Sequence, residues 1–248
     1  AGRMTASAGL HNLPVPLRPA VAAEPGFVFV RADLGQIEPR VLAAVSGDAA
    51  FAEATLADDL YAPVAAKLRV ERSVAKIAVL AAMYGQRSGA AGEALRDLQR
   101  AYPVAMGLLD EAYAAGLARR PLRTFGGRLI RLDSALAPEA GQVVGEGWDA
   151  ARGRFARNAI IQGAAAELFK AWAATVRHHL PSLGGQIVLC LHDELLLHVP
   201  VEASEAVAAL VHQTLTDSSR RWVGASAGPP VRFVADVSII NRWDEAKG

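Results

Sequence analysis

Residues 27–47 read FVFVRADLGQIEPRVLAAVSG, and this stretch decides the fold. Its first seven residues are rich in β-branched and aromatic side chains and follow Pro25-Gly26, so they predict a buried strand that ends at Asp33. Gly35 allows a tight turn, and the apolar residues that recur every fourth position after it predict a helix ending at Gly47. The stretch therefore predicts a strand, a carboxylate at its end and a helix.

The rest of the chain alternates long helical regions with short strands. Residues 50–120 are alanine-rich and helical, 122–132 predict a small basic hairpin, and 148–179 predict another long helix. Two apolar runs, 186–191 and 195–199, flank His192-Asp193-Glu194 and predict a second hairpin, followed by a helix near 202–217 and a strand near 231–240. Because these strands must assemble across long helical segments, we expect an α+β fold with an inserted, mainly helical subdomain.

Composition excludes several classes of protein. The chain has 248 residues, 52% of them hydrophobic and 21% charged, which excludes a disordered or fibrous protein. The single cysteine, Cys190, cannot form an internal disulfide and indicates a cytoplasmic setting. No apolar run reaches the roughly 18 residues of a membrane span, and the start of the chain has no secretory signal, so we expect no membrane partner.

Charge is unevenly distributed along the chain. The overall net charge is +1, but residues 69–160 hold 14 basic and 9 acidic side chains, whereas both flanking regions are slightly acidic. A basic central region is a weak indication of a polyanionic partner.

Two predicted strands each end in an acid, Asp33 in one and Asp193 at the tip of the hairpin in the other. A carboxylate between apolar segments is costly unless cations or hydrogen-bond donors compensate it. Acids from two strands could hold a pair of divalent ions about 3.5–4 Å apart, the arrangement used in phosphoryl transfer, and Mg²⁺ suits it. Each acid alone also fits a structural role, Asp33 as a helix cap and Asp193 as a turn residue.

A second pattern lies on the helix predicted over 71–85. Arg72, Lys76, Leu80 and Tyr84 recur every four residues and form one slowly turning stripe. A triphosphate along this stripe would meet two cations, then an apolar residue and an aromatic ring. The alternative is a solvated basic face whose apolar end packs into a core.

A third set, Arg154, Asn158 and Gln162, lies on one side of the helix predicted over 148–179, just before Gly163. These side chains can donate to phosphates, sugars and minor-groove acceptors. Polar helix faces are common, so the set alone is a weak signal.

Taken in order, these segments resemble the polymerase region of family A DNA polymerases, the polymerase I type. Asp33-Leu-Gly-Gln-Ile-Glu-Pro-Arg40 is similar to the family's first catalytic motif, commonly Asp-Tyr-Ser-Gln-Ile-Glu-Leu-Arg. The segment from Arg72 to Gly85 resembles the fingers helix, and His192-Asp193-Glu194 resembles the third motif. Shorter words, among them Gly2-Arg3-Met4 and the one starting at Trp243, also match in register. The chain resembles most an actinobacterial branch that combines a 3′–5′ exonuclease with the polymerase.

The resemblance implies a role for each motif residue. Asp33 and Asp193 would bind two Mg²⁺ ions, for which Mn²⁺ could substitute, and Glu194 would assist. Arg72 and Lys76 would hold the incoming triphosphate, with Lys76 also protonating the leaving pyrophosphate. Leu80, Tyr84, Gln36 and Glu38 would complete the nucleotide site, where Glu38 excludes a 2′-hydroxyl and could pair with Arg40. The residues implied to line the primer terminus and minor groove are Arg3, His11, Asn12, Arg154, Asn158, Gln162 and His192.

The resemblance also implies a domain layout and its partners. We expect an antiparallel palm sheet with an inserted fingers subdomain: palm over residues 1–48, fingers over 49–147 and palm again over 148–248. The chain starts where the family has already passed its thumb, so we expect a palm-fingers fragment without thumb or exonuclease domains, with weak and distributive synthesis. The expected partners are primer-template DNA and dNTPs, with the chain a monomer in the bacterial cytoplasm, at the nucleoid.

Four departures from the family pattern affect nucleotide binding more than metal chemistry. They are Leu34 for a tyrosine, Tyr61 for a histidine near the phosphates, Ser73 for an arginine and Leu80 for an aromatic residue. They keep two alternatives open. One is an enzyme like the single-subunit RNA polymerases, against which Glu38 argues, and the other is a DNA-binding remnant with impaired catalysis.

Overall fold

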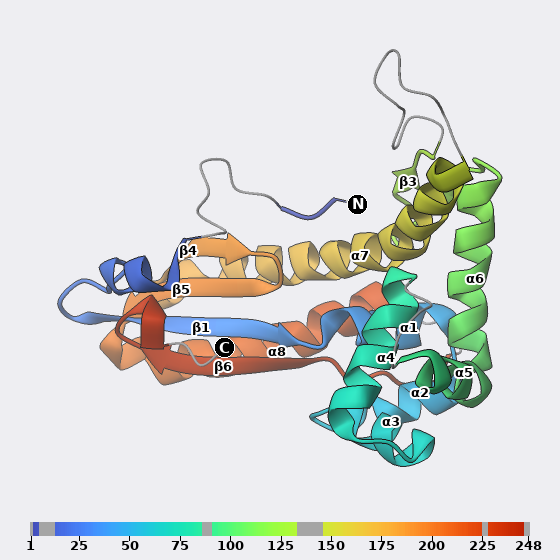
Figure 1. Cartoon of the computed structure of the whole chain (residues 1–248). Coiled ribbons are helices and arrows are strands. Elements are labelled where there is room, and N and C mark those ends of the chain that lie inside the picture. Colours follow the sequence, from blue (N-terminus) through green and yellow to red (C-terminus); the bar gives the residue numbers. More distant parts are fainter. Residues whose placement is uncertain (1, 5–12, 86–90, 133–145, 225–227, 246–248) are drawn as a thin grey trace. The chain divides into compact units, whose positions relative to one another are not determined.

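The predicted first strand is β1 (Phe27–Gly35), an inner strand of a four-stranded sheet with the order β4-β5-β1-β6. The computed structural model describes residues 2–4, 13–85, 91–132, 146–224 and 228–245 (Figure 1). All three strand pairings in this sheet are antiparallel, which confirms the expected α+β class with an antiparallel sheet. The other strands of the sheet are β4 (Gln186–Leu191), β5 (Glu194–Pro200) and β6 (Val234–Ile240).

The pleat of β1 separates two kinds of side chain. Val28, Val30 and Ala32 point to one face and are buried, while Phe29, Arg31 and Asp33 point to the other. The apolar face is covered by α8 (Ser204–Val223), which lies behind the sheet in Figure 1. The last part of α7 (Glu146–His179) packs on α8, where Trp172 donates its indole N–H to the carbonyl of Val211.

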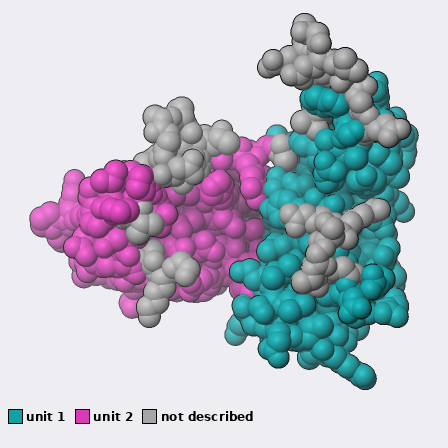
Figure 2. Space-filling view, in the orientation of Figure 1, with its two compact units in different colours: residues 1, 38–165, 226–232 teal, residues 2–37, 166–225, 233–248 magenta. Residues whose placement is uncertain are grey.

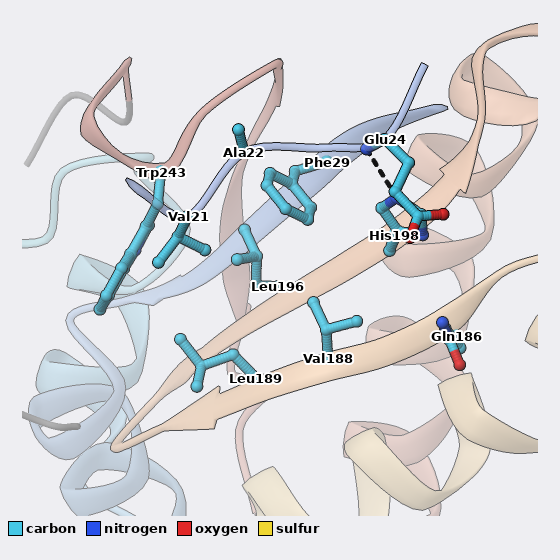
Figure 3. Close-up of a pocket in the computed structure, with 10 residues that line it drawn as sticks. All are labelled: Val21, Ala22, Glu24, Phe29, Gln186, Val188, Leu189, Leu196, His198 and Trp243. Carbon is cyan, nitrogen blue, oxygen red and sulfur yellow. Dashed lines mark hydrogen bonds between the residues drawn. The ribbon is translucent and has the colours of Figure 1, made fainter. Parts of the chain in front are cut away.

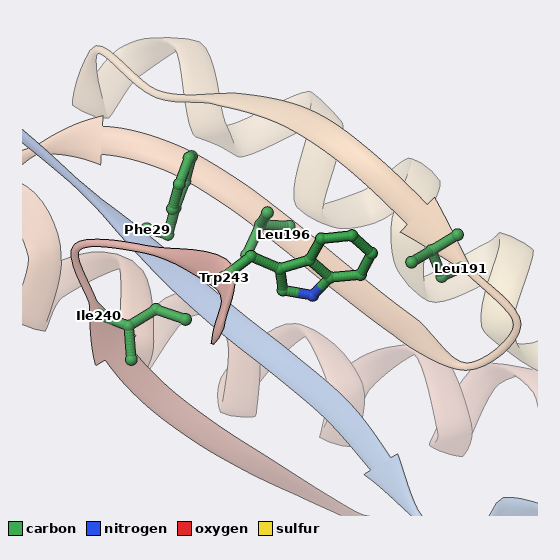
Figure 4. Packing of buried hydrophobic residues seen from close by; sticks show 5 residues of the cluster. All are labelled: Phe29, Leu191, Leu196, Ile240 and Trp243. Carbon is green, nitrogen blue, oxygen red and sulfur yellow. The ribbon is translucent and has the colours of Figure 1, made fainter. Parts of the chain in front are cut away.

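The other face carries a second apolar cluster, shown in Figure 4. Trp243, from the 3-10 helix η5 (Trp243–Glu245), folds back onto the sheet between residues of four strands. Burying such a side chain stabilises the fold by about 1.5–3 kcal/mol. The cluster consists of Phe29, Leu191, Leu196, Ile240 and Trp243.

Three strand ends differ from the sequence-based expectation. The first strand continues past Asp33 to Gly35, because Leu34 and Gly35 also pair with β6. The hairpin loop contains only His192 and Asp193, because Glu194 already pairs with Asp33 as the first residue of β5. The last strand begins at Val234 instead of 231. The backbone N–H of Arg232 donates to Thr55 Oγ1 (3.1 Å) and its carbonyl accepts from Arg40 (2.7 Å), so both groups are used outside the sheet.

The remaining elements are mostly helices. Asp48 ends the loop after α1, caps α2 through the N–H of Phe51 (3.1 Å) and accepts from Val104 and Ala105 at the start of α6 (both 3.1 Å). One carboxylate therefore organises two helix starts. These elements are α1 (Ile37–Ser46), α2 (Ala49–Ala54), α3 (Tyr61–Leu68), α4 (Arg72–Tyr84), α5 (Ala91–Ala101), α6 (Pro103–Leu117) and the hairpin β2 (Leu122–Arg123) with β3 (Leu129–Ile130), beside the short 3-10 helices η2 (Val15–Ala20), η3 (Leu180–Leu183) and η4 (Val201–Ala203).

The chain forms two compact units, coloured separately in Figure 2. Unit 1 comprises residues 1, 38–165 and 226–232, and unit 2 comprises residues 2–37, 166–225 and 233–248. Unit 2 holds the four-stranded sheet, and unit 1 holds helices α2 to α6. The palm and fingers boundaries expected at 48 and 147 stay a prediction. Among the described residues, every helix is too short or too polar to cross a bilayer.

Candidate active site

Three acids lie in one row across the sheet of unit 2. Asp33 on β1 is directly paired with Glu194 on β5 and with Asp236 on β6, so the three side chains leave the same face. Asp193 stands next to this row in the hairpin turn, where its carbonyl accepts the N–H of Leu34 (3.0 Å). Like charges placed directly opposite destabilise a sheet. This row of acids therefore needs a compensating cation.

Arg31 supplies part of that compensation, two residues before Asp33 on the same face. Its guanidinium donates to Glu194 Oε2 through Nε (2.8 Å) and to Asp33 Oδ2 through Nη2 (3.3 Å). Its Nη1 lies 4.0 Å from Asp236 Oδ2. The second oxygen of Glu194 accepts the indole N–H of Trp243 (3.1 Å).

Asp33 is the acid whose ionisation the site disfavours most clearly. Burial, and after it the charge of Asp193, raise the pKa of Asp33 to about 6, although Arg31 acts in the opposite direction. The hydrogen bond from the N–H of Leu34 to the carbonyl of Asp193 (3.0 Å) shows that the two sequence-predicted acids come together in the fold. A buried carboxyl that is held back from ionising is typical of functional sites.

This shift predicts a pH-dependent stability. Between about pH 4 and pH 6 the folded chain keeps a proton on Asp33 that the unfolded chain releases, so the free energy of unfolding falls as the pH rises through that window. A third of the Asp33 side chain is exposed, so solvent screening reduces the effect. We expect the free energy of unfolding of Asp33→Asn to exceed that of the wild type by about 1 kcal/mol at pH 8 and to equal it at pH 4.

Urea denaturation of both proteins at pH 4 and pH 8 measures this difference. The matched control is Asp236→Asn, which removes a charge from the same row but at a side chain that is 73% exposed, and which should change stability by less than half as much. Equal stability of Asp33→Asn and the wild type at pH 8 would contradict the prediction.

The other predicted residues of unit 2 lie in the turns next to the acids or near the start of the chain. His192 is exposed with φ 47, and Gln36 has φ 54, so both occupy left-handed positions in the turns beside Asp193 and Asp33. Arg3 is exposed, and its neighbour Gly2 accepts a hydrogen bond from Lys170 on α7 (2.6 Å). His11 and Asn12 lie outside the described residues.

In unit 1 the predicted stripe lies along the open side of α4. Arg72, Lys76 and Tyr84 are exposed and Leu80 is half-buried, whereas the opposite side of the helix packs inward through Ala75, Ala78, Val79, Ala82 and Met83. Both cationic side chains therefore reach solvent, although Arg72 is also paired with Asp59. The helix ends at Gly85, which has φ +72 and lies under the side chain of Arg154.

Arg72 and Tyr84 each contact a residue from another helix or loop. Arg72 Nη2 donates to Asp59 Oδ1 (3.2 Å), which raises the pKa of the guanidinium, and its charge lies 5.8 Å from the centre of the Tyr61 ring. The hydroxyl of Tyr84 donates to Glu38 Oε2 (3.3 Å). Glu38 itself is buried at the start of α1.

The polar side of α7 is as expected from its spacing. Arg154 is exposed, and Asn158 and Gln162 are half-buried on the same side of the helix in unit 1. Between them Arg157 faces inward, where it donates to Asp110 on α6 (2.6 Å) and to the carbonyl of Ala82 on α4. The structure thus separates an outward-facing polar row from a buried arginine that joins three helices.

Sequence reasoning missed Arg31, Asp59 and Asp236, and did not place Trp243 beside Glu194. The alternation of β1 carries one usable signal, since residue 31 must share the face of residue 33. The other contacts depend on pairing between distant segments. Among the described residues, no group of three or more His, Cys, Asp or Glu side chains is arranged to hold a metal ion.

An apolar pocket of about 340 Å³ lies on the same sheet face, and Figure 3 shows the residues that line it. It is lined by residues of β1, β4 and β5 and by Trp243, and His198 at its edge accepts the backbone N–H of Glu24 (3.3 Å). Neither Asp33 nor Asp193 lines it. The pocket is therefore distinct from the two sequence-predicted acids of unit 2.

An antiparallel sheet that carries paired acids, together with a helical unit that presents arginine and lysine, defines the polymerase-domain class. The fold matches a solved structure of the POL domain of Pol1 from M. smegmatis in complex with DNA primer-template and dNTP (TM-score 0.78, 23% identity, 96% of this chain and 45% of that one).

The chain belongs to DNA polymerase family A, whose model matches residues 2–245. It is 30% identical to DNA polymerase I of Chloroflexus aurantiacus over 98% of this chain and 28% of that protein. It is 31% identical to the thermostable DNA polymerase I of Thermus filiformis over 99% of this chain and 31% of that protein. The chain thus spans less than a third of the length of these relatives.

Proposed function

We propose that the chain carries the palm and fingers of a template-directed DNA polymerase, which transfers a nucleotidyl group from a dNTP to a primer 3′-hydroxyl. The observation that carries this proposal is the convergence of Asp33 and Asp193, 160 positions apart in the sequence, at one edge of the sheet in unit 2. Family membership adds that relatives of this chain are DNA polymerases.

The acids fit a pair of magnesium ions, with Mn²⁺ as a substitute. Mg²⁺ uses one or two protein carboxylates and completes its shell with water and substrate phosphates, so Asp33 and Asp193 suffice without a larger ligand cluster. The pKa of Asp33 is raised first by burial and then by the charge of Asp193, and a divalent cation would offset both effects. When bound there, Mg²⁺ would stabilise negative charge on the attacking and leaving oxygens.

The stripe on α4 is proposed to bind the triphosphate. Arg72 offers a planar fork for two phosphate oxygens, and Lys76, one turn later, a compact charge. Lys76 would also donate the proton that the leaving pyrophosphate takes up. These two residues position and neutralise the substrate while the chain itself forms no covalent bond.

The end of the stripe is proposed to read the sugar and the base. Glu38 is fixed by the Tyr84 hydroxyl, which orients a buried carboxylate beside the aromatic ring. A fixed carboxylate at this place would exclude a 2′-hydroxyl, while Tyr84 stacks by the templating base and Leu80 gives apolar contact without stacking. Gln36 would contribute from the turn before α1.

The duplex is proposed to contact the polar row of α7 and the turns of unit 2. The residues assigned to it are Arg3, His11, Asn12, Arg154, Asn158, Gln162 and His192. Glycine at 163 permits close approach of a backbone at the end of the row. We propose that the chain acts as a monomer at the bacterial nucleoid, since the named relatives are bacterial polymerases.

Primer extension by the 248-residue chain tests this function. We expect Mg²⁺-dependent addition of dNTPs to a labelled primer-template and no addition in the presence of EDTA. Incorporation of rNTPs with equal efficiency would favour the RNA polymerase alternative. Binding of primer-template without any nucleotide addition would favour the DNA-binding remnant, which the residues Leu34 and Leu80 also favour.

The contact between Arg72 and Asp59 gives a prediction about nucleotide affinity. Asp59 occupies the guanidinium that the triphosphate needs, so Asp59→Asn should lower the KM for dNTP by about two- to three-fold, the worth of an exposed ion pair. Asn keeps an acceptor for the N–H of Tyr61 (3.2 Å), so the start of α3 is preserved.

Steady-state extension at varied dNTP concentration measures this KM. The control is Asp58→Asn, because the carboxylate of Asp58 pairs with Arg232 (2.6 Å) and not with Arg72. We expect the KM of this variant to equal that of the wild type. A raised KM for Asp59→Asn would show that Asp59 orients Arg72 instead of competing with the substrate.

A further inference from the structure

Arg31 is a buried cation at the centre of an acidic surface. Its side chain is 8% exposed, although arginine is almost never buried unless its charge is paired. It lies on β1, between β5 and β6, and two residues before Asp33. Its side chain therefore leaves the same face of the sheet as the row formed by Asp33, Glu194 and Asp236. From this position one guanidinium reaches all three acids.

The contacts within the row are unequal. Glu194 receives two donors of Arg31, at 2.8 and 2.7 Å, on Oε2, and its Oε1 receives the indole N–H of Trp243. Asp33 receives one donor at 3.3 Å, and Asp236 is only at ion-pair distance. Both oxygens of Glu194 are therefore bound by fixed donors, whereas Asp33 remains only partly engaged.

We propose that Arg31 is a positioning residue of the metal centre: it acts as a built-in counter-charge that holds Glu194 and Asp33 in place before metal binds, and it weakens the affinity for divalent cations. This inference rests on the proposed function. Glu194 then serves as the partner of Arg31, and Asp33 and Asp193 stay the carboxylates proposed to bind metal.

Charge explains why the affinity falls. A positive charge 3.3 Å from a ligand carboxylate repels an incoming cation and reduces the negative potential that the acids create. Without Arg31 the paired acids would face each other uncompensated in the apo protein, and Glu194 could turn toward the metal. The guanidinium thus lowers the metal affinity of the site and keeps the acidic side chains ordered before metal binds.

Mn²⁺ binding to the full chain tests the inference without any measurement of catalysis. Free Mn²⁺ is followed by electron paramagnetic resonance at pH 8. We expect Arg31→Gln to bind Mn²⁺ at least three-fold more tightly than the wild type, and Arg31→Lys, which keeps the charge, to stay within two-fold. Equal or weaker binding by a folded Arg31→Gln would overturn the proposal.

A double variant keeps the test decisive if Arg31→Gln does not fold. Arg31→Gln with Glu194→Gln removes one charge of each sign, so no buried charge is left unpaired, and its Mn²⁺ affinity should lie within two-fold of the wild type. A ten-fold weaker affinity would show that Glu194 is a metal ligand and would overturn the proposal. If the wild type binds no more Mn²⁺ than Asp193→Asn, the proposed metal site fails and the role of Arg31 fails with it.

Discussion

Asp193→Asn is expected to reduce Mg²⁺-dependent primer extension by on the order of 10³-fold while the chain stays folded. The substitution keeps the size of the side chain and its place in the two-residue turn, and the carbonyl that accepts from Leu34 is unaffected. It removes one of the two charges that are proposed to hold the cations. Single-turnover extension at saturating dNTP measures the loss, and circular dichroism confirms the fold.

The control for this loss is Asp236→Asn, because it removes the same charge from the same face of the sheet. Asp236 is 73% exposed and lies 4.0 Å from Arg31, so we expect extension within about three-fold of the wild type. If Asp193→Asn extended primers as fast as Asp236→Asn, the assignment of the metal ligands would be wrong. A general dependence on negative charge would instead lower both variants alike.

Local patterns predicted the elements that carry the acids. The apolar run before Asp33 and the runs on both sides of His192 are short-range signals, and both produced strands in the structure. The four-residue spacing from Arg72 to Tyr84 likewise produced a helix with one exposed side. Such signals succeed because the pleat and the helical turn repeat every two and 3.6 residues whatever lies around them.

Pairing between distant segments could not be predicted in this way. Asp236 joins the row of acids only because β6 pairs with β1 in one register, and a shift of one residue would turn its side chain to the other face. Trp243 reaches Glu194 because η5 folds back over the sheet. The sequence places Arg31 on the same face of the strand as Asp33, but which acids it contacts depends on how β5 and β6 pair with β1.

Arg40→Met is expected to destabilise the chain by about 3–5 kcal/mol, because Arg40 is fully buried and its guanidinium donates to four main-chain carbonyls. These are the carbonyls of Thr55, Ala57, Asp58 and Arg232, at 2.6 to 2.9 Å. Burial lowers the pKa of Arg40 to about 10, and these acceptors offset the cost of keeping the charge inside. Methionine fills part of the volume and leaves the carbonyls without these donors.

Urea denaturation of Arg40→Met beside Arg100→Met separates this role from a general loss of charge. Arg100 is 78% exposed and pairs with nearby Asp97 on α5, so its replacement should cost less than about 0.5 kcal/mol. Arg40→Lys should fall between them, since a lysine keeps the charge but cannot supply a planar fork to several acceptors.

The loop that Arg40 holds ends next to Asp59, the partner of Arg72, so its stability bears on the nucleotide site of unit 1. In a partly destabilised but folded Arg40→Lys, the position of Asp59 should loosen, and the KM for dNTP should shift toward that of Asp59→Asn. A variant that loses stability with an unchanged KM would confine Arg40 to folding. A KM that changes together with stability would show that the contacts of Arg40 with its four carbonyls support the position of Arg72, the residue proposed to bind phosphate.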